Sequence, residues 1–172
     1  MSFIKNIATY LLSLKESPKV KKQFFSWNQI SKILIIAHHN QLSDIVEFIN
    51  ICKKDSIAAH VAVINEGKAE QAAKPHFEHT MIDKKQFSFF DLPYQALVQK
   101  LNTHNFDVLI NLGNINQQKA LSLSKLVNAK CKIGRFQQPL FDLTIEGDGT
   151  HNNLTFLQQV IVYLKMIKTN PS

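Results

Sequence analysis

Three short runs of aliphatic residues constrain the fold of this chain more than any other feature. They lie at Lys32–Ala37, Ile57–Ile64 and Asp107–Leu112. Aliphatic runs of this length, rich in Val and Ile, are typical of strands that are buried on both faces of a parallel sheet. Segments with helical spacing separate them, which implies right-handed crossovers with helices on both faces. The sequence therefore predicts an α/β fold, a Rossmann-like three-layer sandwich with a mostly parallel sheet of five or six strands.

The segments between and after these runs predict the remaining elements. We expect helices from Asn40 or Ser43 to about residue 53, at 94–101, at 115–127 and at 152–168, and strands at Glu78–Ile82, Lys130–Ile133 and Phe141–Glu146. A chain of 172 residues has the length of one ordinary domain. We therefore expect a single Rossmann-like domain at residues 26–170.

The first 25 residues read differently, as an amphipathic helix followed by a basic linker. Apolar residues recur at positions 3, 7, 10, 11 and 14, which is helical spacing. The segment has no small-residue cleavage site and is too short to span a bilayer, so we expect neither a signal peptide nor a membrane span. We expect residues 3–14 to contact a protein partner or a second copy of the chain.

Charge and cysteine content limit the location and the partners. Six lysines and one glutamate lie before position 33, a pattern that can contact phosphate or anionic lipid, although a solvated linker also explains it. Cys52 and Cys131 lie far apart in apolar surroundings without a secretory signal, which favours free buried thiols and a cytoplasmic location.

Ligands of such sheets bind beyond the carboxyl ends of the strands, where the strand order reverses. The candidates by this rule are two groups after apolar strands and a glycine-bracketed turn after the last strand: His38, His39 and Asp44; Asn111, Gly113 and Asn114; Asp148 and His151. No glycine-rich phosphate loop is present, and we predict no cofactor.

The candidate residues suggest limited chemistry. His38 and His39 next to Asp44 suggest a general base oriented by a carboxylate, although one histidine can equally cap a strand or helix end. The segment 76–79 contains two histidines and a glutamate but no further ligand, so we predict a polar loop and no metal site. Asp107 and Asp142 precede strands, away from the ligand edge, and we expect them to bind backbone N–H groups or lysines.

The segments at Phe106–Asn111, Lys130–Arg135, Phe141–Ile145 and Tyr163-Leu164 resemble a family of short bacterial proteins that is classed only as a domain of unknown function. The resemblance covers most of the second half of the chain, and the first half by element order. It implies an α/β fold and a cytoplasmic location, and it assigns no catalytic residue.

A weaker resemblance is to the N-terminal half of heptosyltransferase-like glycosyltransferases. Lys32–Ile36 with Ser43-Asp44, Phe106–Asn111 and Ile133–Arg135 carry it. The resemblance implies that Asp44 activates the acceptor. However, Ser43 replaces the glycine of the family's pattern, and 172 residues leave no room for a second, nucleotide-sugar-binding domain.

Three functions follow as hypotheses. The first is a non-catalytic domain that acts through a protein partner or an oligomer interface. The second is a small ligand-binding protein or glycosyltransferase-like enzyme that uses a pocket at the carboxyl ends of the strands. The third is weak nucleic-acid or membrane-surface binding through the basic segment Lys15–Lys32.

Overall fold

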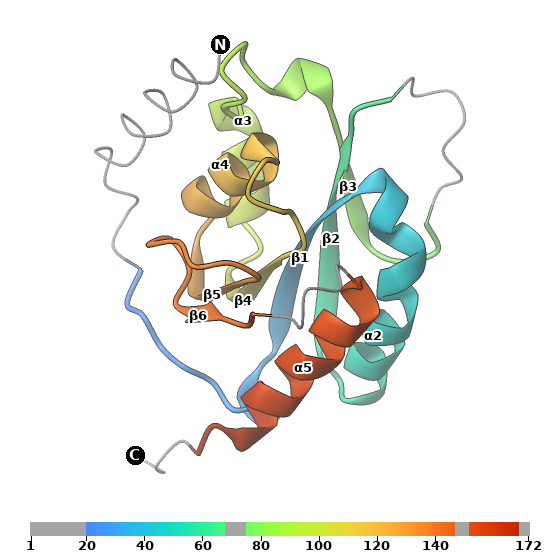
Figure 1. Cartoon of the computed structure of the whole chain (residues 1–172), viewed down its shortest axis with the longest axis vertical. Coiled ribbons are helices and arrows are strands. Elements are labelled where there is room, and N and C mark those ends of the chain that lie inside the picture. The colour runs from blue at the N-terminus through green and yellow to red at the C-terminus, as the bar shows by residue number, and fades with distance from the viewer. Residues whose placement is uncertain (1–19, 68–74, 147–151, 169–172) are drawn as a thin grey trace.

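The computed structural model describes residues 20–67, 75–146 and 152–168. In these ranges a sheet of six parallel strands has helices on both faces (Figure 1). The strands are β1 (Lys32–His38), β2 (Ala58–Asn65), β3 (His79–Asp83), β4 (Phe106–Asn111), β5 (Ala129–Gly134) and β6 (Leu143–Thr144). The helices are α2 (Leu42–Lys54), α3 (Gln95–Asn102), α4 (Gln118–Leu126) and α5 (Asn153–Met166). The order of strands across the sheet is β3-β2-β1-β4-β5-β6.

The pleat of β1 divides the core into two layers. Ile33 and Ile35 belong to the cluster that contains the apolar faces of α2 and α5. Leu34 and Ile36 belong to the other cluster, with apolar residues of α3 and α4. This alternation follows from the two-residue period of a strand, and Figure 1 shows the two helix pairs on opposite sides of the sheet.

The predicted fold class is confirmed, with differences at the ends of the chain. The last strand is limited to Leu143–Thr144, although the N–H groups of Asp142 and Ile145 also donate to β5, to the carbonyls of Lys132 and Gly134. The predicted N-terminal helix lies outside the described residues. Among the described helices, none is both long enough and apolar enough to cross a membrane.

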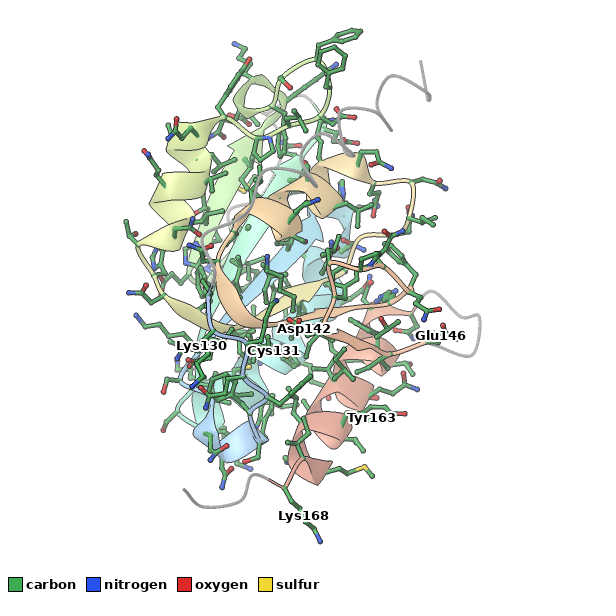
Figure 2. All side chains as sticks on the ribbon, turned by 90° about the vertical axis from the view of Figure 1, so that its left-hand side faces the viewer. Lys130, Cys131, Asp142, Glu146, Tyr163 and Lys168 are labelled. Carbon is green, nitrogen blue, oxygen red and sulfur yellow. The ribbon has the colours of Figure 1, made fainter. Side chains whose placement is uncertain are left out.

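The two aspartates at strand starts bind backbone, as predicted. Asp107 accepts hydrogen bonds from the N–H groups of Ser31 at 2.9 Å and Lys32 at 3.1 Å, and from Lys130 Nζ at 2.9 Å. Asp142 accepts from the N–H group of Lys132 and from Lys22 Nζ, both at 2.8 Å. These contacts join neighbouring strands near their amino ends, the side of the sheet that we call the amino edge. Figure 2 labels Lys130 and Asp142.

Strand β5 differs from a simple amphipathic strand because both of its faces are covered. Cys131 is buried on the α2 and α5 side, and burial raises the pKa of its thiol to about 12. Lys132 is also buried, with 8% of its surface exposed, and its Nζ donates to the carbonyl of Lys125 in α4. Burial lowers the pKa of Lys132 to about 8. Cys131 and Lys132, neighbours in β5, are therefore both buried.

Candidate functional site

The strand order reverses between β1 and β4, because the chain adds β2 and β3 on one side of β1 and β4 to β6 on the other. A cavity of about 710 Å³ lies beyond the carboxyl ends of these strands. Its walls come from the N-terminal ends of α2 and α5 and from the segments that follow β4 and β5. Position and volume both match the usual ligand site of α/β sheets.

Asn153, the first residue of α5, organises the polar wall of this cavity. Its side chain is buried, with 6% of the residue surface exposed. Its Oδ1 accepts from Arg135 Nη2 at 2.6 Å and from Gln41 Nε2 at 3.3 Å, while its Nδ2 donates to Asp44 Oδ2 at 2.7 Å. One amide thus joins a guanidinium and a carboxylate that come from different elements.

Gln41 connects this wall to the two central strands. Its Oε1 accepts from the N–H group of His38 at 2.8 Å, and its Nε2 also donates to the carbonyl of Leu112 at 3.1 Å. The ends of β1 and β4 and the start of α5 therefore share one side chain. The polar side-chain atoms of Gln41 and Asn153 all have partners, which holds these two side chains in place before a ligand binds.

Arg135 directly follows β5, and its guanidinium stacks 4.5 Å from the centre of the Phe156 ring. Burial lowers the pKa of Arg135, and the Asp44 carboxylate partly offsets this effect. The Nε of Arg135 is buried and has no hydrogen-bond partner, and the same is true of Gln159 Oε1, which lines the same cavity. The cavity wall thus contains an unpaired donor and an unpaired acceptor.

The structure brings together some of the residues predicted from the sequence. Asp44 and Asn114 both line the cavity. His38 does not pair with Asp44, because it has the same strand parity as Leu34 and Ile36 and therefore lies on the α4 side. Burial lowers the pKa of His38; the field of Glu66 opposes this shift and that of Lys119 adds to it. His38 and Asp44, one of the predicted pairs of base and orienting carboxylate, thus lie on opposite faces of the sheet.

Asn111 and Gly113 form part of the packing between β4 and α4. Asn111 is fully buried, and its Nδ2 donates to Ser124 Oγ at 2.8 Å and to the carbonyl of Ala120 at 3.3 Å. Its Oδ1 accepts from the N–H group of Gly113 at 2.6 Å. A Cβ at Gly113 would approach this oxygen to 2.8 Å and Ala120 Cβ to 2.9 Å. Both residues therefore shape the turn beneath the cavity.

The other candidates have separate positions. His39 is half-buried in the short turn before α2. Asp148 and His151 lie outside the described residues, as do residues 3–14. Of the basic segment, Lys22 pairs with Asp142, and Lys32 Nζ donates to the carbonyl of His104 at 3.3 Å.

Sequence reasoning missed three residues of the polar wall: Gln41, Arg135 and Asn153. Arg135 had a usable signal, since it directly follows a predicted strand and so belongs to the ligand edge by the rule that selected Asp44. Asn153 had none, because an asparagine at the start of a helix usually indicates a cap. The actual cap is Asn152, whose Oδ1 accepts from the N–H groups of Leu154 and Thr155.

A separate set of side chains has the composition of a metal site. Within the described ranges, His60, Glu78 and His104 each place one possible ligand atom within 4.8 Å of the others. By sequence, Glu78 is grouped with the two histidines of the segment 76–79. The fold instead associates Glu78 with histidines from two distant segments.

Comparison with known proteins gives a family and no activity. A family model described as a family of unknown function, DUF6913, matches residues 2–167. Searches of curated proteins and of solved structures returned no match.

Proposed function

The chain belongs to the DUF6913 family, whose function is unknown, and we propose that it binds a small polar ligand in the cavity beyond the carboxyl ends of the strands. We call this side of the sheet the carboxyl edge. One observation carries this proposal. Three buried side-chain atoms in the described part of the chain lack a hydrogen-bond partner, and two of them, Arg135 Nε and Gln159 Oε1, belong to residues that line this cavity. An unsatisfied buried polar group costs about 1–3 kcal/mol. A ligand that accepts from Arg135 and donates to Gln159 would remove both costs.

The charges around the cavity suggest the chemistry of this ligand. Arg135 and the N-terminal ends of α2 and α5 favour an anionic group. Asp44 and Glu146 line the same space and favour a ligand that also has hydroxyl or amino hydrogens. We therefore propose a hydroxyl-bearing anion, such as a sugar phosphate or a nucleotide, held by side chains in place of a glycine-rich loop.

The glycosyltransferase-like alternative belongs to the same cavity. It requires Asp44 to take a proton from a hydroxyl of the ligand. Asp44 Oδ2 already accepts from Asn153, and Oδ1 accepts from Ser43 Oγ at 3.2 Å, so each oxygen keeps one further acceptor site. Binding of a ligand hydroxyl uses such a site without any proton transfer, and we therefore propose binding as the function.

A thermal-shift screen of the full chain with sugar phosphates, nucleotides and amino acids tests the ligand proposal. We expect one class to raise the Tm of the wild type, because a ligand that binds only the folded state stabilises it. The shift should disappear in Arg135→Gln and Asp44→Asn and persist in the control His76→Ala, whose residue is exposed on another part of the surface. No shift with any class, or equal shifts in all variants, contradicts the proposal.

The partner or oligomer hypothesis is a second candidate, and one surface feature favours it. Val162, Tyr163 and Met166 of α5 are 55%, 48% and 68% exposed, and Figure 2 shows Tyr163 projecting from α5. Neighbouring exposed apolar side chains are typical of interaction surfaces. If copies of the chain associate there, light scattering should show an oligomer for the wild type and a smaller species for Met166→Lys. A monomer for both excludes the oligomer.

We further propose a cytoplasmic location. Cys52 and Cys131 support it, since both are free and buried, as is common in a reducing compartment.

A further inference from the structure

We propose that His60, Glu78 and His104 bind a divalent transition-metal ion, with Zn²⁺ as the best match. His60 is the third residue of β2, Glu78 immediately precedes β3, and His104 lies in the turn between α3 and β4. All three therefore lie at the amino ends of the strands, opposite the edge that carries the cavity. This proposal is independent of the ligand proposed above.

His60 is the fixed member of the group. Its residue surface is 6% exposed, its Nδ1 lies 2.9 Å from Glu78 Oε1, and its Nε2 lies 2.9 Å from Thr80 Oγ1. A hydroxyl can donate or accept, so Thr80 is compatible with either tautomer of His60. Without a metal, Nδ1–H donates to Glu78 and Thr80 donates to Nε2. With a metal, the ion replaces the proton on Nδ1, and Nε2–H donates to Thr80.

This second arrangement is the usual one around metal-bound histidines. The ring nitrogen that does not bind the ion donates to an oxygen, which fixes the tautomer and the ring orientation. Thr80 is itself buried on the neighbouring strand, so the acceptor is held in place. The fold thus supplies an oriented ligand together with the group that orients it.

The side chains of His104 and Glu78 can change position more easily than that of His60. The His104 ring stacks on Phe106 at 5.5 Å and lies 4.7 Å from the His60 ring, centre to centre. Glu78 has a side chain that is 62% exposed. A tetrahedral site with Zn–N bonds of about 2.0–2.1 Å needs ligand atoms about 3.4 Å apart. The ligand atoms lie within 4.8 Å of one another, with His60 Nδ1 and Glu78 Oε1 at 2.9 Å, so small rotations of the His104 and Glu78 side chains bring all three to the required spacing.

The ligand types select among metals. Two imidazoles and one carboxylate suit Zn²⁺ and neighbouring transition metals, whereas Mg²⁺ and Ca²⁺ prefer oxygen ligands alone. Three protein ligands of this kind leave a fourth position for water or another oxygen donor. The exposure of Glu78 gives that position access to solvent.

Calorimetry of the metal-free full chain with ZnCl₂, and absorption spectra with CoCl₂, test the proposal. We expect binding of one ion per chain and a tetrahedral Co²⁺ spectrum without a thiolate charge-transfer band. Glu78→Gln removes the charge and keeps the shape, and His104→Ala removes an imidazole from a turn. Each should weaken Zn²⁺ binding by at least about tenfold, as loss of even an indirect metal contact does.

The control is His76→Ala, which removes an exposed histidine two residues before Glu78 and should bind Zn²⁺ like the wild type. Circular dichroism of each variant checks that the fold is retained. The proposal is overturned if the wild type binds no ion, if both ligand variants bind Zn²⁺ as tightly as the wild type, or if the His76 variant loses binding equally.

Discussion

The two edges of the sheet place polar groups in different ways. At the carboxyl edge, the buried amide of Asn153 fixes Arg135, Asp44 and Gln41 through direct hydrogen bonds. Of the three proposed metal ligands at the amino edge, only His60 lies inside a strand, and its partners Glu78 and His104 come from connecting segments. The first arrangement favours one ligand shape, whereas the second can adapt to a small ion. The comparison predicts that substitutions at the carboxyl edge affect stability more.

The largest effect is expected for Asn153→Ala. The change leaves Arg135 and Asp44 partly buried without the amide that joins them, and breaking such a set costs about 2–4 kcal/mol. Urea denaturation of the variant should show this loss in the free energy of unfolding. The control Asn114→Ala removes an exposed asparagine of the same cavity and should cost much less. Equal losses would remove the special role of Asn153.

Gly134→Ala probes the packing beneath Arg135. A Cβ at this position would lie 2.3–2.6 Å from ring atoms of Phe141, so the ring or the strand must move, and overpacking of this kind costs about 1–3 kcal/mol. Gly67→Ala is the matched control, because among the described residues its Cβ would meet only Asn65 Oδ1, at 3.6 Å. Thermal denaturation of both variants measures the difference. A Tm for Gly134→Ala as high as that of the control would show that the edge is not tightly packed.

The ionisation of Asp107 makes the stability of the fold at the amino edge depend on pH. Burial alone would raise the pKa of this carboxyl, but the hydrogen bonds from Lys130, Ser31 and Lys32 outweigh it and lower the pKa. The stabilisation is therefore fully present above the unfolded pKa of about 3.9, and is lost as the pH falls through the lower folded value.

Asp107→Asn should cost about 1–2 kcal/mol at pH 7, because hydrogen bonds to a charged group are lost. The difference from the wild type should shrink as the pH falls below about 4. Urea titrations between pH 2 and 7 measure it. A difference that does not change with pH would mean that the charge of Asp107 contributes nothing.

The smallest effect is expected for Glu78→Gln in the presence of EDTA. The amide oxygen of glutamine can still accept from Nδ1–H of His60, and the contacts of a carboxylate that is 62% exposed contribute only about 0–1 kcal/mol. We expect a change in unfolding free energy below about 0.5 kcal/mol, measured by urea denaturation. A large loss of unfolding free energy without metal would show that Glu78 stabilises the fold itself. Substitutions at both edges would then affect stability to a similar degree.

The sequence was sufficient for the layers of this fold and for part of its site. Continuous aliphatic runs have one stable placement, inside a covered parallel sheet, so β1, β2 and β4 could be located from their residues. The edge rule found Asp44 and Asn114, because it needs only the end of a strand. The rule placed His38 and Asp44 together, because it does not say to which face of the sheet a side chain points. His38, the last residue of β1, points to one face, and α2, which carries Asp44, begins on the other.

The contacts of Asn153 and of His60 depend on tertiary structure alone. Asn153 lies 109 residues from Asp44, and His104 reaches His60 only because the turn after α3 crosses the start of β1, where Lys32 binds its carbonyl. No local spacing encodes such meetings. The burial of Lys132 could not be predicted for a similar reason. Alternation along a strand does not reveal that α4 covers the second face.

All six residues of β4 are buried, and this strand pairs with β1 on one side and β5 on the other. Amide hydrogens in such a strand exchange with solvent only when the sheet opens as a whole. In the described part of the chain, the two-residue β6 and the outer strand β3 pair with a strand on one side only, and we expect them to exchange through smaller openings. We therefore expect β4, which ends directly before the cavity-lining Leu112, to be the slowest of the described strands to open, and the sheet to open from its outer strands inward.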